Sequence, residues 1–355
     1  MRLILFTGAG GAGVTTLAAA TAALIAGAGT PVLLVGAEDE PLRDVLGPPE
    51  HLPATLRLAV ADADAALGAD AGGVLAWLRS LLAWGGLDPA LVQQLSLIPT
   101  ARLLAALLKA TGEREGVAVV DLGPAAGALP LLHLLATDPA AVSDADGLGQ
   151  LTARLAGPVI SRLVDLPRPD AGVRGAGERA AGRLERLRVL LRDTAATSVR
   201  LVLPADGRAP FIERETRTVC GLHGLGFDAI LARASVPRSD EDAPPRLDAL
   251  WQSGPPRGQA ALADLARLVY AGRDPSAGLS PPRVPRVELT DDGADLLLPL
   301  PARPAEQFRV GRSGARLTVQ AGEWRRSLAL PAALRGLTGR RAWHDGGGLR
   351  IRFGR

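Results

Sequence analysis

The apolar positions near the N-terminus follow the order of a buried strand, a glycine-rich loop and a helix. A short apolar run at residues 3–6 ends at Gly8, and an alanine-rich run follows Thr16. Residues 31–35 and 117–120 are also short apolar runs, with the length of buried parallel strands. Such runs alternate with longer helical patterns along the chain. We therefore expect an α/β domain with a doubly wound, mostly parallel sheet.

Helical patterns dominate two long stretches between these runs. Residues 55–110 and 129–166 are apolar at helical spacing, and we expect a helical subdomain over roughly residues 50–110 and 127–192. Residues 167–182 combine glycine, proline and charge without periodicity, which predicts a flexible segment. Residues 211–227 predict a helix with Cys220 packed toward the core.

The composition changes after a proline-rich linker at residues 273–286. Turn signals then recur about every ten residues, between short alternating runs, and this spacing is typical of a small all-β sandwich. The runs lie at residues 294–300, 307–311, 315–320, 323–331 and 348–353. The expected organisation is a P-loop-type domain at residues 1–272, the linker, and a sandwich at residues 287–355.

The glycine-rich loop is the strongest candidate binding site. A strand, a glycine loop and a helix in this order form a phosphate cradle, because glycines let backbone N–H groups turn inward and the helix N-terminus adds partial positive charge. The candidate ligand-binding residues are Gly8, Gly10, Gly11, Gly13, Thr15 and Thr16.

The loop sequence GAGGAGVTT, residues 8–16, resembles the deviant Walker A motif GKGGVGKTT of the ArsA-like ATPases, which drive arsenite pumps or target tail-anchored proteins. Both lysines of the motif are absent, and Ala9 and Val14 stand in their places. A lysine about 4 Å from a phosphate is worth about 4 kcal/mol at an effective dielectric of about 20. Its loss corresponds to roughly three orders of magnitude in affinity. We expect no cofactor, or weak ATP or ADP binding with Mg²⁺.

Two acidic residues fall where the resemblance implies catalytic or metal-binding roles. GAEDEPLRDVLG, residues 36–47, is similar to the family segment whose aspartate positions the attacking water, and Glu38 is the closest match. Asp121 follows the run at residues 117–120 and matches an aspartate near the metal, so Thr15 and Asp121 would hold Mg²⁺ if a nucleotide binds. A solvated acidic turn at Glu38 and a turn-capping Asp121 are the alternatives. Ala232 replaces the asparagine that reads adenine in the family.

The C-terminal runs also resemble a known domain. AGEWRRSLALPAALRG and the later DGGGLRIRF are similar to the α-crystallin domain of small heat-shock proteins, and Arg325, Arg326, Leu330 and Pro331 carry the match. This domain could bind clients, or it could only support the first domain.

Composition limits the other functions. Cys220 is the single cysteine, which excludes disulfides within the chain and cysteine-based zinc sites. The arsenite sites of the family use several cysteines, so the resemblance does not extend to metalloid binding. The net charge is +3, and no basic block with interleaved aromatics suggests nucleic-acid binding. No apolar run reaches the roughly 18 residues of a membrane span, and we expect a cytoplasmic protein.

These patterns favour a pseudo-ATPase that acts as a binding or chaperone-type protein. The resemblance implies a homodimer, or a heterodimer with an intact ArsA-like paralogue. The apolar segments at residues 74–84, 103–108 and 129–135 fall where relatives form a groove for hydrophobic helices, although ordinary sheet-covering helices explain them equally well. The alternative is a slow or partner-activated Mg²⁺-dependent ATPase.

Overall fold

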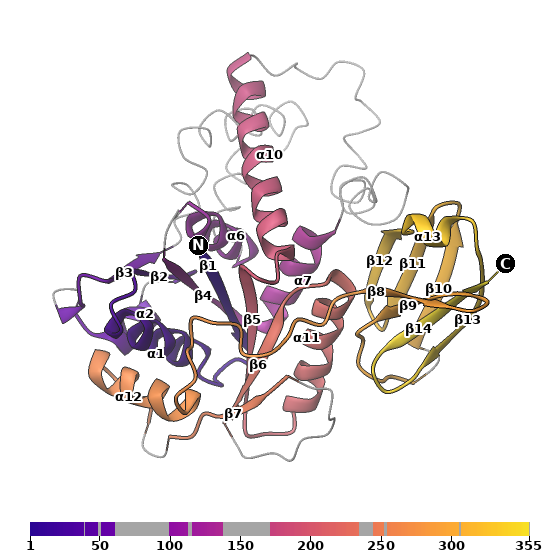
Figure 1. The fold of residues 1–355 in the computed structure, drawn as a ribbon. Helices are drawn as coiled ribbons and strands as arrows, with labels where there is room; N and C mark the ends of the chain where they lie inside the picture. Colours follow the sequence, from indigo (N-terminus) through magenta and orange to yellow (C-terminus); the bar gives the residue numbers. More distant parts are fainter. Residues whose placement is uncertain are drawn as a thin grey trace, which may run out of the picture.

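An α/β domain and a β-sandwich lie side by side in the computed structural model (Figure 1). The structure describes residues 1–38, 40–48, 51–60, 99–112, 116–137, 171–233, 244–251, 254–304 and 307–354.

Seven parallel strands form the sheet of the α/β domain, in the order β3-β2-β4-β1-β5-β6-β7. The strands are β1 (Arg2–Gly8), β2 (Val32–Gly36), β3 (Leu56–Val60), β4 (Val117–Pro124), β5 (Thr197–Leu203), β6 (Phe227–Ala232) and β7 (Arg246–Asp248). In the centre, Leu5 of β1 pairs in register with Val120 of β4 and with Val199 of β5. The expected parallel α/β sheet is confirmed.

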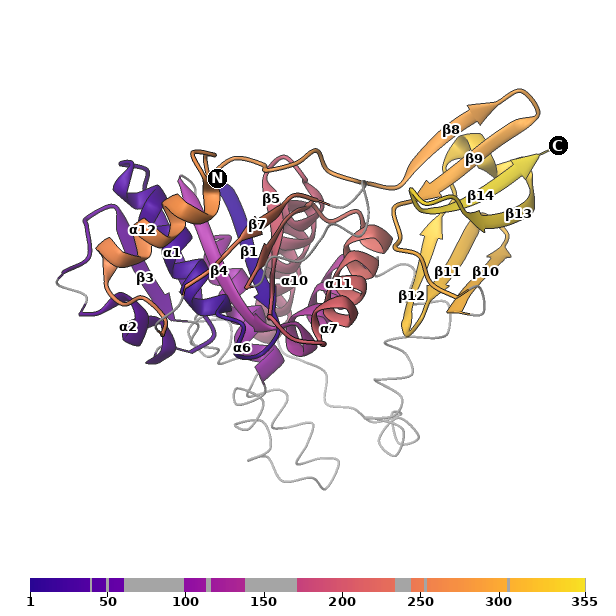
Figure 2. The same ribbon diagram turned by 90° about the horizontal axis from the view of Figure 1, so that it is seen from below.

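Helices cover both faces of this sheet, as Figures 1 and 2 show. Alternation along β1 explains the two layers, because Ile4 and Phe6 pack on one face while Leu3 and Leu5 pack on the other. The first face carries α1 (Val14–Gly27), α2 (Glu40–Leu46) and α12 (Gln259–Tyr270). The second carries α6 (Pro99–Ala110), α7 (Ala125–Ala136), α10 (Ala171–Arg192) and α11 (Ala209–His223).

Two local predictions were wrong. Residues 56–60 form strand β3 and not a helix, because this short segment finds its hydrogen-bond partners along the edge of β2. Residues 171–182 form the first half of α10 and not a flexible segment. Alanine and arginine favour a helix there, and the half that follows packs on the core through Leu187 and Leu191.

Two of the three apolar segments that could have formed a client groove pack mainly against the sheet. In α6, Leu103 and Leu107 are buried against the sheet, and so are Leu129 and Leu132 in α7. Residues 74–84 lie outside the described residues, as do residues 61–98 and 138–170 of the expected helical subdomain as a whole.

Two antiparallel sheets form the C-terminal sandwich, which confirms the expected all-β fold. Their orders are β10-β11-β12 and β13-β14-β9-β8. The core between them contains Leu298, Val319, Ile351 and Phe353. The elements are β8 (Arg286–Thr290), β9 (Gly293–Leu298), β10 (Phe308–Ser313), β11 (Arg316–Ala321), β12 (Trp324–Ala329), α13 (Ala332–Arg335), β13 (Thr338–His344) and β14 (Leu349–Gly354).

Helix α11 of the α/β domain forms a contact with the sandwich. Its Glu215 accepts hydrogen bonds from Arg303 Nη2 at 2.7 Å and from Trp324 Nε1 at 2.8 Å. Leu222, near the end of the same helix, is part of the sandwich core. The sandwich therefore packs on α11 through buried polar and apolar contacts.

Candidate functional site

The glycine loop lies between the carboxyl end of β1 and the first turn of α1, as the sequence predicts. Gly11 and Gly13 have φ angles of 78° and 93°, in the left-handed region that favours glycine. A Cβ atom on Gly8 would lie 2.2 Å from the carbonyl oxygen of Val202 in β5. The glycines therefore let the loop turn sharply and let β1 run close to β5.

Backbone N–H groups at the start of α1 face no capping side chain. Gly13 is the N-cap residue, and no side chain of the described part of the chain donates or accepts a hydrogen bond at this cap. The first N–H groups of a helix have no partner within the helix, and a phosphate or another anion can accept their hydrogen bonds. The backbone half of a phosphate cradle is therefore present.

The two positions of the missing lysines are filled by apolar side chains that pack inward. Ala9 and Val14 are 3% and 7% exposed and belong to the core beneath α1. The amide of Ala9 also donates to the carbonyl of Val202 at 3.3 Å, so it is not free to bind an anion. Neither position supplies positive charge to the loop.

Asp121 stands beside the loop at the carboxyl end of β4. Its Oδ1 accepts a hydrogen bond from the amide of Gly123 at 2.8 Å, and its carboxylate also contacts the Thr15 hydroxyl. The Thr7 hydroxyl donates to the carbonyl of Gly123 at 3.0 Å and holds this turn against β1. Burial raises the pKa of the Asp121 carboxyl, and the two hydrogen bonds act in the opposite direction. The predicted pair of Thr15 and Asp121 does come together.

Glu38 lies at the same edge of the sheet, just after β2, but it faces outward. Its side chain is 66% exposed and stands 3.9 Å from the guanidinium of Arg102 in α6. It is close enough to Asp121 for its charge to contribute to the raised pKa of that carboxyl. This geometry fits a solvated acidic turn better than a residue that holds a water molecule.

A stacked arginine and tryptophan close one side of the loop. The loop, Gly123, Pro124 and Pro255 line a hollow of about 310 Å³ together with Arg233 and Trp251. The guanidinium carbon of Arg233 lies 3.3 Å from the centre of the Trp251 ring, within cation–π distance. A Cβ atom on Gly13 would lie 2.6 Å from Cη2 of Trp251, so the indole touches the loop backbone.

The backbone next to β6 explains how Trp251 reaches the loop. The amide of Ala249 donates to the carbonyl of Ala232 at 2.8 Å, which fixes the end of β7 beside the end of β6. Ala232, at the position where the family has an adenine-reading asparagine, is 2% exposed. Arg233 follows it and turns its side chain into the hollow.

A second arginine, Arg208, reaches the rim of the loop. It is exposed and held by Asp206, with Nη2 at 2.7 Å from Oδ2. Its Nη1 also donates a long hydrogen bond of 3.5 Å to the carbonyl of Gly10. The positive charge at this loop therefore comes from Arg208 and Arg233 and not from the loop itself.

Comparisons with known proteins agree with this geometry. Residues 1–251 match the family model described as anion-transporting ATPase, and residues 291–353 match the HSP20-like domain found in ArsA. The chain belongs to the ArsA family of anion-transporting ATPases.

Two curated proteins are similar to this chain of the ArsA family. An uncharacterized protein of Streptomyces coelicolor is 34% identical over 394 aligned positions, which cover 99% of this chain and 97% of the relative. A protein of Aquifex aeolicus named as an arsenical pump-driving ATPase is 24% identical, over 67% of this chain and 64% of the relative. The first similarity includes the sandwich as well as the α/β domain.

The residues of this ArsA-family site fit a Mg²⁺–nucleotide only in part. The loop backbone can hold phosphate oxygens, and a hydroxyl and a carboxylate are the ligands that Mg²⁺ takes beside phosphates. Thr15 and Asp121 supply that pair. The lysine positions do not fit, since Ala9 and Val14 carry neither charge nor a hydrogen-bond donor.

Sequence reasoning found the loop and Asp121 but missed Trp251, Arg208 and Thr7. A usable signal existed for Trp251, because it follows a short strand whose carboxyl end meets the other carboxyl ends in a parallel sheet. The other two residues carry no motif.

Two features are absent from the part of the chain that the structure describes. None of the helices in those ranges has the length and apolar character needed to cross a membrane. Within the same ranges, no group of three or more histidine, cysteine, aspartate or glutamate side chains could hold a metal ion.

Proposed function

We propose that this chain is a pseudo-ATPase of the ArsA family that acts by binding another protein. The observation that carries the proposal is the burial of Ala9 and Val14 at the two lysine positions of the phosphate loop. Charge that develops on phosphate oxygens in the transition state would meet backbone N–H groups and no lysine of the loop. The stack of Arg233 and Trp251 narrows the same hollow.

Calorimetry with Mg·ATP and Mg·ADP at up to millimolar ligand, together with a steady-state hydrolysis assay, tests the proposal. We expect weak or no nucleotide binding and no turnover above the rate without protein. Turnover on the order of 1 s⁻¹ or more, at the lower end of ordinary enzymes, by the wild-type chain alone would overturn it.

Restoring the P-loop lysine tests whether the rest of the site is intact. Val14 is among the residues that line the hollow, so Val14→Lys adds a positive charge at its wall. We expect Mg·ATP to bind up to about a thousandfold more tightly than to the wild type. Val14→Met, which has a long side chain without charge, is the matched control. If Val14→Lys binds no better than Val14→Met, the hollow does not accept nucleotide.

The proposed partners are a second copy of this chain, an intact ArsA-like paralogue, or a hydrophobic helix of a client protein. Pairing of two ATPase halves in the family supports the first two, and the HSP20-like domain supports a client. Since α6 and α7 bury most of their leucines against the sheet, we favour a protein partner over a helix bound between these two helices. Sedimentation velocity of the chain alone and with a coexpressed paralogue distinguishes the two kinds of dimer.

One observation favours the second candidate, a slow or partner-activated ATPase. The contact between Thr15 and Asp121 preserves the ligands that Mg²⁺ would need. A partner could then supply the missing positive charge from its own side chains. If partner-stimulated hydrolysis is measured, Thr15→Ala and Asp121→Asn should each abolish it, while Glu38→Gln, at an exposed position, should change it little.

A further inference from the structure

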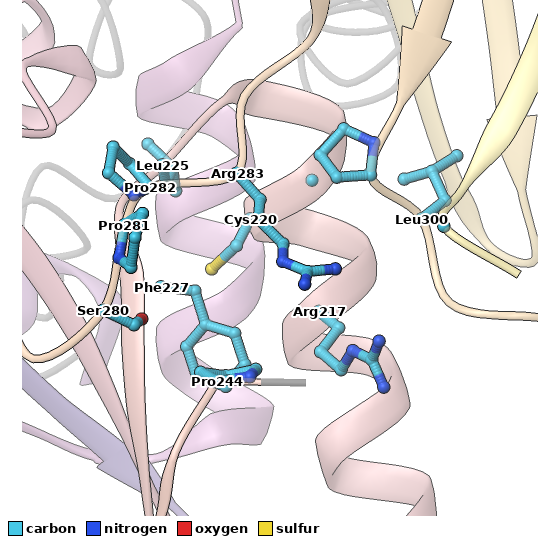
Figure 3. A pocket seen from close by; sticks show the side chains of 13 residues that line it. Arg217, Cys220, Leu225, Phe227, Pro244, Ser280, Pro281, Pro282, Arg283 and Leu300 are labelled. Carbon is cyan, nitrogen blue, oxygen red and sulfur yellow. The ribbon is translucent and has the colours of Figure 1, made fainter. Parts of the chain in front are cut away.

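Two hollows in the described part of the chain contain arginines that are held in different ways. One is the cleft between α11, the sandwich and the connecting segment, which is residues 271–285 between α12 and β8. Arg217 and Arg283 line this cleft (Figure 3), and both have interaction partners. The other hollow lies at the phosphate loop, where the guanidinium of Arg233 stacks on the Trp251 ring. The Arg233 charge is therefore held by an aromatic ring.

The Trp251 ring lies directly against the start of α1. A Cβ atom on Gly13 would be 2.6 Å from Cη2 and 2.9 Å from Cζ2 of the indole, and both atoms belong to its six-membered ring. Gly13 is the N-cap residue of α1. The N–H groups of the first helical turn, which follows this residue, are those that a phosphate would reach. The six-membered ring of Trp251 therefore stands beside the place where a phosphate would bind.

Arg233 holds the ring in this position. Its backbone amide donates to the carbonyl of Leu203 at 3.0 Å, which fixes the point from which the side chain starts. The side-chain Nε is buried and has no hydrogen-bond partner among the described residues. No acidic side chain is among the described residues that line the hollow. Because a cation–π contact is stronger when the cation is partly removed from water, the stack favours the position of the ring over the loop.

We infer that Trp251 is an autoinhibitory plug of the phosphate loop, and that a ligand with a phosphate group must displace its ring before it binds at the start of α1. The inference rests on the proposed function, because it adds a second cause of weak nucleotide binding to the loss of the two lysines. The apparent affinity is lowered by the fraction of molecules in which the ring has moved away from the loop. Shortening or removing the ring should therefore raise the affinity without adding charge to the loop.

Calorimetric titration of the full chain with Mg·ADP and with inorganic pyrophosphate tests the plug. Trp251→Phe keeps an aromatic ring for Arg233 but lacks the indole atoms that touch Gly13, and Trp251→Ala removes the ring. We expect both ligands to bind at least roughly threefold more tightly to Trp251→Phe than to the wild type. The gain should reach up to about thirtyfold in Trp251→Ala, which also loses the cation–π contact.

Trp343→Phe is the matched control. Trp343 lies in β13 of the sandwich, with the guanidinium carbons of Arg341 and Arg352 at 5.6 Å and 5.4 Å from its ring centre, and it does not line the hollow. This variant should bind both ligands as the wild type does.

Three results would overturn the plug. The first is an affinity in both Trp251 variants no higher than in the wild type, and the second is the absence of binding in every protein tested. The third is a gain for Mg·ADP without a gain for pyrophosphate, since the ring would then exclude the nucleoside and not the phosphates. All three would leave the pseudo-ATPase proposal standing, because that proposal fails only if the wild-type chain hydrolyses ATP.

Discussion

Arg200 carries its charge in the interior of the α/β domain, where its side chain is completely buried. Its Nε donates to Asp228 Oδ1 at 3.2 Å, and its Nη1 donates to the Tyr270 hydroxyl at 3.1 Å. The same aspartate accepts a hydrogen bond from the amide of Leu279, so it also holds the connecting segment. Arg200 and Asp228 therefore connect the sheet, helix α12 and the segment that leads from α12 to the sandwich.

Asp228→Asn should therefore be strongly destabilising. The change leaves the Arg200 charge buried without its counter-charge, which costs about 3–5 kcal/mol in comparable pairs. Urea denaturation monitored by circular dichroism measures the free energy of unfolding. Asp264→Asn breaks an exposed pair with Arg267 and should cost less than about 1 kcal/mol. Equal effects of the two variants would contradict this account of Asp228.

Single residues also show where prediction from the sequence succeeds and where it fails. Gly13 and Asp121 could be assigned to the site because a glycine loop after a strand and an acidic residue at a strand end have direct physical meaning. Trp251 lies far from the loop along the chain, and only the packing of β7 beside β6 brings it to Gly13. The burial of Val14 likewise follows from tertiary packing, and the sequence alone shows only that this position of the loop has no lysine.

At the scale of elements, α7 and α11 meet through the half-buried His133 and the buried His223. His223 Nε2 and His133 Nδ1 are 2.8 Å apart, and the ring of Trp324 packs against His133. Burial lowers the pKa of both imidazoles, and the nearby charge of Arg326 from β12 acts in the same direction. Arg192 of α10 also disfavours the charged form of His223. Both histidines are therefore held neutral in the folded protein.

This arrangement predicts that stability falls in mild acid. In the unfolded chain the two histidines take up protons as the pH drops below about 6.5, whereas in the folded chain they stay neutral to lower pH. Protonation therefore favours the unfolded state. The free energy of unfolding decreases by up to about 1.4 kcal/mol for each unit by which a folded-state pKa is lowered. Denaturation at pH 7.5 and pH 5 should show this loss, and His223→Gln should reduce it. His51→Gln, at an exposed histidine, should leave the pH dependence unchanged. An identical loss in His223→Gln would contradict the assignment to this pair.

The elements that the sequence predicted well are those whose hydrophobic pattern has one interpretation. Strands β1, β2 and β4 are short apolar runs bounded by glycine or charge, and each was expected. Strand β3 was not, because five residues at the edge of a sheet carry too weak a pattern to exclude a helix. Helix α10 contains several glycines in its first half, which is why that half did not look helical in the sequence. The apolar spacing typical of a helix is clear only from Leu184 onward.

At the scale of the whole molecule, the two domains touch closely at Gly221 of α11. A Cβ atom there would lie 2.2 Å from the carbonyl oxygen of Pro299, so only glycine allows the helix and the sandwich to approach this far. The contact is reinforced by Glu215, which accepts hydrogen bonds from Arg303 and Trp324 of the sandwich. Because these groups are buried together, we expect both domains to unfold in one transition.

Gly221→Ala tests this coupling without removing any charge. Within a helix this change is favourable by about 1 kcal/mol, so a loss of stability must come from the contact with Pro299. We expect the single calorimetric transition of the wild type to separate into two, with the sandwich and the α/β domain melting at different temperatures. Gly182→Ala in α10 is the matched control, since its added methyl would meet only an arginine side-chain atom at 3.7 Å. If Gly221→Ala melts in one transition at or above the wild-type temperature, the two domains do not depend on this contact, and the sandwich is held by the other contacts with α11, those of Glu215 and Leu222.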